Sequence, residues 1–135
     1  LGPAWTNNHE KIIAILNELI NNRPHPMCSI AAQQLGGYVN TNKTTSFIHR
    51  DSMWKPWITA SWGKNDDKGK ELSLKWLKDS WDRLEPYCPG IHLAQLHHHL
   101  DWNSKETLAA FGAALPSLKE LKSNCDPNGL LPSLL

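Results

Sequence analysis

The chain has 135 residues, enough for a small hydrophobic core, and its 14 Lys and Arg nearly balance its 13 Asp and Glu. This balance gives no basic surface for nucleic acid or for an anionic membrane, and we predict neither partner. The longest apolar run is far shorter than the roughly 20 residues that a membrane-spanning helix needs.

An amphipathic helix is the first predicted element. Asn7 and Glu10 have the spacing of a capping box, in which each side chain satisfies a free backbone amide of the first turn. Apolar residues then recur on one face at helical spacing, namely Ile12, Ile13, Leu16, Leu19 and Ile20. The helix is expected to end in residues 21–26, because proline cannot continue it. Residues 27–35 are predicted to be a strand, which Gly36-Gly37 closes.

Residues 45–62 are predicted to form two extended pieces that break near Lys55-Pro56. The second piece, residues 57–62, alternates between two faces with the period of two that a strand has. A polar loop follows, and then a second helix that ends at Pro86. The apolar stripe of this helix is expected to consist of Leu74, Leu77, Trp81 and Leu84.

The last third of the chain is predicted to begin with a short strand, residues 91–97. Ser104 is the expected cap of a third helix, and Pro116 is expected either to kink this helix or to begin a new turn. Asp126-Pro127-Asn128-Gly129 has the composition of a turn. The predicted fold class is therefore α+β, with antiparallel strands that lie at the edge of a larger sheet and are covered by helices.

Three cysteines, Cys28, Cys88 and Cys125, cannot all pair within the chain. The remaining thiol would be either free and buried or bonded to a partner chain. Asn42-Lys43-Thr44 is an acceptor sequence for N-glycosylation in a polar stretch, which favours a secreted glycoprotein with a sugar on Asn42. The chain begins Leu1-Gly2-Pro3, which we interpret as the product of proteolytic processing or as the remainder of a longer protein.

A series of short motifs carries a resemblance to a known family. In chain order they are Gly36-Gly37-Tyr38-Val39, Ser46-Phe47-Ile48-His49-Arg50-Asp51, Tyr87-Cys88-Pro89-Gly90, Ile91-His92-Leu93-Ala94-Gln95-Leu96, Ala110-Phe111-Gly112 and Leu118-Lys119-Glu120-Leu121-Lys122-Ser123-Asn124-Cys125-Asp126-Pro127-Asn128. Their order and spacing resemble the C-terminal end of the berberine-bridge-enzyme-like FAD-linked oxidases. The resemblance covers residues from about 28 to about 131.

The resemblance implies that the chain is the C-terminal portion of a two-domain FAD-linked oxidase fold. Residues 1–100 would end the substrate-binding domain, and residues 101–135 would pack back on the FAD domain. FAD would be bound mainly by an N-terminal FAD-binding chain, as the partner in a heterodimer. The substrate would be a small molecule, namely a sugar, an alcohol, or a compound of phenolic or alkaloid type.

The resemblance also implies site residues. Gln95, Phe111 and Gly112 would contact the cofactor, and His49 and Arg50 would line the substrate cavity. Independently of the resemblance, Trp57 is expected in the substrate cavity, because the flat faces of Trp54, Trp57 and Trp62 suit a sugar ring or an aromatic substrate. Leu93 stands where the family has a tyrosine, so His92 or His97 would serve as the general base in its place, since histidine changes its charge near neutral pH. For each of these positions the alternative is a structural role: a buried strand for residues 92–97, an Arg50 salt bridge, and packing for the tryptophan.

Other departures from the family pattern favour an alternative function. Ala114 and Ser117 replace an asparagine and an arginine that make polar contacts in the family. A catalytically lapsed homologue on the same scaffold, serving in binding, defence, pigmentation or storage, would show this pattern. His97-His98-His99 predicts no metal site, because no further ligands converge with it by spacing. An independent metal- or sugar-binding module, based on the histidines and tryptophans, is the third alternative.

Overall fold

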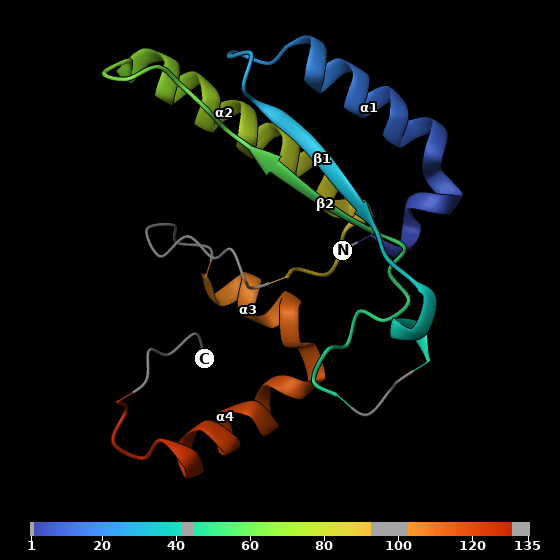
Figure 1. The fold of residues 1–135 in the computed structure, drawn as a ribbon, viewed down its shortest axis with the longest axis vertical. Helices are drawn as coiled ribbons and strands as arrows, with labels where there is room; N and C mark the ends of the chain where they lie inside the picture. Colours follow the sequence, from blue (N-terminus) through green and yellow to red (C-terminus); the bar gives the residue numbers. More distant parts are fainter. Residues whose placement is uncertain (1, 42–44, 93–102, 131–135) are drawn as a thin grey trace. The chain divides into compact units, whose positions relative to one another are not determined.

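The computed structural model of the chain describes residues 2–41, 45–92 and 103–130 (Figure 1). Its regular elements are a 3-10 helix Pro3–Asn8, α1 His9–Asn21, β1 Ser29–Gln34, a 3-10 turn Gly37–Asn40, β2 Trp54–Thr59, α2 Asp67–Leu84, a 3-10 turn Glu85–Tyr87, α3 Asn103–Phe111, a 3-10 turn Gly112–Ala114 and α4 Leu115–Cys125. The α+β class is confirmed. Within the described residues, no helix is long and apolar enough to cross a membrane.

The chain forms two compact units that are not consecutive in sequence. The first unit consists of residues 1–36 and 52–89, and the second consists of residues 37–51 and 90–135. The first unit contains the sheet, α1 and α2, and the second contains α3 and α4. The predicted division near residue 100 concerns the domains of a larger protein and stays a prediction.

The sheet of the first unit consists of β1 and β2, which pair antiparallel with Ile30 opposite Ile58 and Ala32 opposite Pro56. Because side chains alternate along a strand, Ile30, Ile58 and Trp54 share one face. These three pack against the buried cluster of the unit. The predicted strand at residues 27–35 is therefore confirmed, within two residues at its start and one at its end.

The predicted break at Pro56 is wrong, since β2 continues through it. The Leu35 N–H donates to the Met53 carbonyl at 2.8 Å, on the side of β2 that faces β1, and the Gly2 N–H donates to the Trp54 carbonyl at 2.8 Å on the opposite side. Backbone groups alternate between the two sides of a strand, so Pro56 faces outward like Trp54. It costs the ladder no hydrogen bond, because its missing N–H lies on the outer edge. The first predicted extended piece is absent, because residues 45–53 contain no strand.

The core of the first unit is a cluster of Trp5, Ile12, Leu84 and Cys88, each at most 8% exposed. The Trp5 ring stacks on Trp54 with 6.3 Å between ring centroids, and its Nε1 donates to Cys88 Sγ at 3.2 Å. The face of the Trp5 indole is therefore in contact with another ring, and its N–H has a hydrogen-bond partner, as a buried tryptophan requires.

The start of α1 differs from the predicted capping box of Asn7 and Glu10. A 3-10 helix runs directly into α1, and Asn8, the N-cap residue, makes no side-chain cap hydrogen bond. Its Nδ2 instead donates to the Ala4 carbonyl at 2.9 Å. Because the 3-10 helix leads directly into α1, backbone groups at the start of α1 can bond to the preceding turn, and no capping box is needed to satisfy them.

The face of α2 that meets the core also differs from the predicted stripe. Ser73, Trp76, Ser80 and Leu84 are buried, whereas Leu74 is 42% exposed. Two long-range hydrogen bonds set this rotation: Ser73 Oγ donates to the Ser61 carbonyl at 2.7 Å, and Trp76 Nε1 donates to the Leu19 carbonyl at 2.9 Å. The two serines let the helix approach its neighbours closely, which apolar periodicity alone does not predict.

The two serines give opposite predictions for alanine substitution. Ser73→Ala removes a satisfied buried hydroxyl and is expected to lower the free energy of unfolding by about 1–2 kcal/mol. Ser80 Oγ is buried without a hydrogen-bond partner, so Ser80→Ala is expected to raise the free energy of unfolding by about 1 kcal/mol, helped by the higher helix propensity of alanine. Urea unfolding of both variants measures the difference. Equal destabilisation by Ser73→Ala and Ser80→Ala would contradict these opposite predictions.

The C-terminal helices follow the prediction closely. Phe111 ends α3, Gly112 has a positive φ of 46°, and Pro116 lies in the first turn of α4, where its missing N–H costs nothing. α3 begins at Asn103, one residue before Ser104, the predicted cap.

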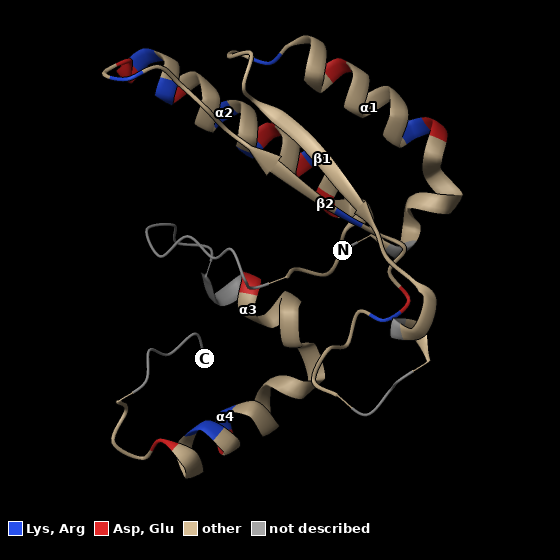
Figure 2. Cartoon of the chain, viewed as in Figure 1, with Lys and Arg blue, Asp and Glu red and all other residues tan. Residues whose placement is uncertain are grey.

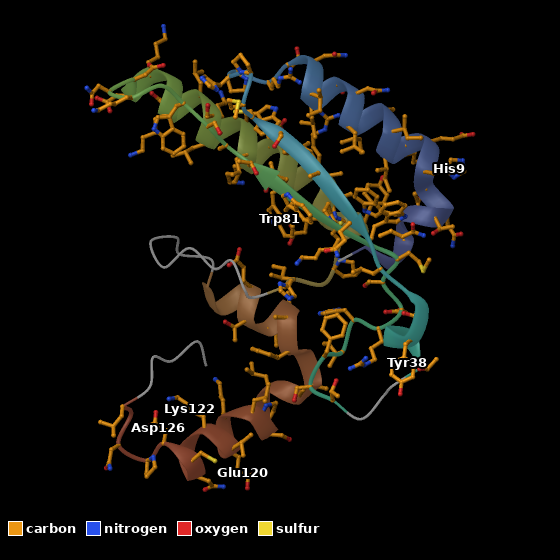
Figure 3. All side chains as sticks on the ribbon, viewed as in Figure 1. His9, Tyr38, Trp81, Glu120, Lys122 and Asp126 are labelled. Atoms are coloured by element: carbon orange, nitrogen blue, oxygen red, sulfur yellow. The ribbon has the colours of Figure 1, made fainter. Side chains whose placement is uncertain are left out.

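The predicted turn after α4 is confirmed. The Gly129 N–H donates to the Asp126 carbonyl at 3.1 Å, and Asp126 Oδ1 accepts from the Leu130 N–H at 2.8 Å. Lys122 forms an ion pair with the other carboxylate oxygen (Figure 3). Asp126 thus fixes both the end of α4 and the following turn.

Candidate functional site

Residues from three of the sequence motifs meet in the second unit at Ile48 and His49. Its Nε2 lies 2.7 Å from the carbonyl oxygen of Ala109 in α3, although the two residues are 60 positions apart. A carbonyl oxygen accepts and never donates, so we infer that Nε2 carries a proton. In the neutral ring, Nδ1 is then the acceptor nitrogen. The hydrogen bond fixes the orientation of a half-buried imidazole.

Two glycines allow this arrangement. A Cβ at Gly90 would lie 2.4 Å from His49 Nδ1, and a Cβ at Gly112 would lie 2.7 Å from Ile48 Cδ1. Gly112 also needs its positive φ to connect α3 to the next turn. The His49 side chain therefore packs directly on the backbone at Gly90, and the Ile48 side chain packs on the backbone at Gly112.

Arg50 lies over the aromatic ring of Phe47, with its guanidinium carbon 5.4 Å from the ring centroid. Its Nη2 donates to Thr45 Oγ1. The Phe47 and His49 rings meet edge to face, with 6.1 Å between centroids. The three side chains thus form one cluster, in which the cation–π contact contributes about 0.5–1 kcal/mol when it is exposed.

The third residue predicted for the substrate cavity, Trp57, belongs to the first unit and lies on β2. Its ring is 38% exposed and Lys55 Nζ lies 5.9 Å from the ring centroid. Trp57 thus presents a partly open aromatic face beside a cation. Its predicted place in one cavity with His49 and Arg50 stays a prediction.

Only some of the predicted catalytic and cofactor-binding residues lie in the part of the chain that the structure describes. His92 is exposed, and neither Ile91 nor His92 belongs to a strand. Phe111 and Gly112 lie at the end of α3, beside the carbonyl that binds His49. His97, Gln95, the neighbouring Leu93 and the glycosylation candidate Asn42 lie outside the described residues, as does the rest of the strand predicted for residues 91–97.

All three cysteines are free, so none pairs with another in the chain. Cys28 is buried, and its Sγ lies 3.4 Å from the Ser61 N–H that donates to it. Burial raises the pKa of the Cys88 thiol, although the hydrogen bond from Trp5 acts in the opposite direction. Cys125 at the end of α4 is exposed.

Reactivity toward iodoacetamide is expected to separate these thiols. The thiolate is the nucleophile, so buried Cys88, whose pKa is raised, should stay unmodified in the native protein while Cys125 reacts. Peptide mass spectrometry after native labelling, with a urea-unfolded sample as the control, measures the order. Native labelling of Cys88 before Cys125 would contradict the buried core.

The raised pKa of Cys88 also predicts a pH dependence. Because the Cys88 thiol loses its proton more readily in the unfolded chain, the free energy of unfolding should fall as the pH rises above the ordinary thiol pKa.

Metal and cavity candidates are sparse in the described part of the chain. Among those residues, no three His, Cys, Asp or Glu side chains gather in a way that would hold a metal ion. A shallow hollow of about 300 Å³ lies at the C-terminal end of α1, lined by Ile20, Asn21, Arg23 and Pro26. None of the predicted site residues lines this hollow.

Sequence reasoning missed two participants in the His49 arrangement. Ala109 contributes a backbone carbonyl, for which a sequence carries no signal, and Gly90 had been noted as part of a motif without a role. The chain matches no known protein family, no curated protein and no solved structure. The family resemblance therefore stays an expectation that rests on the motifs.

Proposed function

We propose that the chain is the C-terminal part of a secreted FAD-dependent oxidoreductase. It would close a substrate cavity over a flavin that is bound mainly by an N-terminal chain, and the substrate would be a sugar, an alcohol, or a phenolic or alkaloid-type molecule. The close packing of His49 on Gly90 and of Ile48 on Gly112, which brings residues of three separate motifs together, is the observation that carries this proposal, since random matches to short motifs would have no reason to pack together.

The second unit also supports a missing partner. Its described residues bury few apolar side chains, among them Ala110, whereas Tyr38, Ile48, Leu108, Leu121 and Leu130 are between 41% and 82% exposed. A partner chain packed against this unit would remove these side chains from water. The N-terminal FAD-binding chain would provide that cover.

The proposed division of labour follows from what the described residues can supply. FAD, when bound, would accept a hydride from the substrate. Phe111 and Gly112 at the end of α3 would contact the cofactor, although the close approach of Ile48 already accounts for a glycine at position 112. His49 would hold the cavity wall in one orientation through Ala109, and Arg50 would supply a fixed positive charge for polar substrate groups. His92 or His97 would take up the substrate proton, and Gln95 would contribute its amide.

An absorbance spectrum of the purified native protein, beside reducing and non-reducing gels, tests this proposal. We expect the two visible and near-ultraviolet bands of an oxidised flavin and a second, larger chain in the same fraction. A colourless protein that still carries its partner would contradict the flavoenzyme and leave the lapsed homologue. Ala114 and Ser117, which cannot replace the family's polar contacts, favour that alternative.

A further inference from the structure

The helix layer of the first unit is expected to be wider than the sheet it covers. Both α1 and α2 contribute to the cluster that packs on the Ile30 and Ile58 face, and the two helices also contact each other (Figure 1). Packed helices lie about 8–10 Å apart, whereas paired strands lie about 4.8 Å apart. Two helices are therefore expected to reach beyond two strands.

The side of α1 away from α2 carries partly exposed apolar residues. Glu18 faces α2, because Arg83 Nη2 donates to its carboxylate at 2.7 Å. At 100° per residue, Ile13 and Ile20 lie about 140° and about 160° around the helix from Glu18. Ile13 is 54% exposed and Ile20 is half-buried. The side of α1 away from α2, beside β1, thus presents two incompletely covered isoleucines.

The flank of α2 shows the same pattern on the other side. Leu74, Leu77 and Trp81 lie between about 120° and about 180° around the helix from Arg83, which faces α1. Leu74 is 42% exposed, and the other two are half-buried (Trp81 is labelled in Figure 3). The apolar stripe predicted from the sequence is real, but it lies beside the core.

The two edges of the sheet differ in their protection. On the outer edge of β2, Gly2 bonds to Trp54, and Pro56 offers no N–H. On the outer edge of β1, the outward groups belong to Ile30, Ala32 and Gln34, for which the described part of the chain provides no hydrogen-bond partner. Natural edge strands carry proline, charge or bulges that prevent pairing. β1 has none of these and is uncharged along its length (Figure 2).

We infer that the outer edge of β1 accepts one further β-strand. Its backbone would pair with Ile30, Ala32 and Gln34, and its apolar side chains would cover Ile13 and Ile20 on α1. The facing surface carries no charged side chain on β1, so the added strand is an uncharged segment with alternating apolar and polar residues. The inference that the flavin-carrying chain supplies this strand rests on the proposed function.

A second copy of the chain fits this edge less well. In an antiparallel pairing of β1 with itself about Ala32, each Ile30 would stand opposite a Gln34. Each apolar side chain would then meet an amide on the face toward the helices, where cross-strand pairs of apolar residues are favourable. A strand of different sequence can place an apolar residue at both positions.

Hydrogen exchange of the native protein tests the edge. The outward amides of Ile30 and Gln34 are expected to exchange as slowly as the paired amides of Ala31 and Gln33. Ala32→Pro copies onto β1 the proline that stands opposite it on β2. It should speed exchange at Ile30 and Gln34 about tenfold or more while Ala31 and Gln33 stay slow. Ala31→Pro, which removes a donor inside the ladder, is the control and should open both strands.

Fast exchange of Ile30 and Gln34 in the unmodified native protein would overturn the inference. A photo-crosslinking residue in place of exposed Gln34 then identifies the occupant. We expect a crosslink to a segment of another chain, and a crosslink to β1 of a second copy would overturn that assignment. Flavin absorption is measured on the same sample. If the protein contains flavin but the Ile30 and Gln34 amides exchange fast, only the added strand is refuted. If these amides exchange slowly and a second chain is crosslinked, but the protein is colourless, only the oxidase is refuted.

Discussion

Replacing Leu84 with alanine is expected to lower the free energy of unfolding of the first unit by about 2–5 kcal/mol. Leu84 is 1% exposed and belongs to the cluster with Trp5, Ile12 and Cys88. Truncation removes buried methyl groups and leaves a cavity that the indole and the helices can fill only in part. Urea unfolding followed by tryptophan fluorescence measures the loss, because all tryptophans except Trp102 lie in the first unit.

Leu74→Ala on the same helix is the matched control. Leu74 is 42% exposed, so its truncation should cost less than about 1 kcal/mol. The two leucines belong to the same apolar stripe in the sequence, and the substitution is chemically identical. Equal losses at both positions would show that α2 is rotated relative to the arrangement described above, with the stripe of Leu74, Leu77 and Trp81 toward the core.

Gly90→Ala is expected to destabilise the second unit by about 1–3 kcal/mol, the usual range for overpacking. The new Cβ would lie 2.4 Å from His49 Nδ1, and the imidazole cannot move aside without losing its hydrogen bond to Ala109. Faster hydrogen exchange in the peptide that spans residues 106–111 of α3 would report the loss.

A double-mutant cycle with His49→Ala separates the clash from other effects of the new methyl group. In the His49→Ala background the imidazole is gone, so Gly90→Ala should cost only a small fraction of its effect in the natural chain. Additive effects of the two substitutions would mean that Gly90 is needed for a reason other than the approach of His49.

Local signals account for the parts of the fold that the sequence predicted. Pro116 can begin a helix but cannot continue one, and Asp126-Pro127-Asn128-Gly129 combines the residues that a turn requires. Both signals depend on neighbours within a few positions, and the structure follows them. β1 was likewise predicted from its flanking glycines.

Long-range contacts account for the errors. The rotation of α2 depends on hydrogen bonds from Ser73 to Ser61 and from Trp76 to Leu19, and the second of these spans 57 positions. Pro56 was predicted to break a strand because proline disrupts a central strand, but β2 has an outer edge on which the missing N–H does no harm. Whether a strand is central or at an edge is a property of the whole sheet.

The candidate site was predictable as a set of motifs but not as a geometry. The sequence singled out His49 and the Ala110-Phe111-Gly112 element separately, more than 60 positions apart, and spacing gives no distance between them. The bond joins a side chain to a backbone carbonyl, which every residue carries, so no residue type marks the acceptor. Trp57 was grouped with His49 because it is near in sequence and its ring can stack on a substrate, although the two residues belong to different units.

The segments of the two units alternate along the chain, and this order affects how fast β1 can pair with β2. Residues 37–51 belong to the second unit but lie in the chain between β1 and β2, so Ser29 must find Thr59 across a segment that has its own structure to form. The entropy cost of closing that loop is lower once the segment is ordered, because its ends then fluctuate over a smaller volume. A substitution confined to the second unit, such as Gly90→Ala, should therefore slow the refolding of β1 onto β2 while leaving its unfolding rate nearly unchanged.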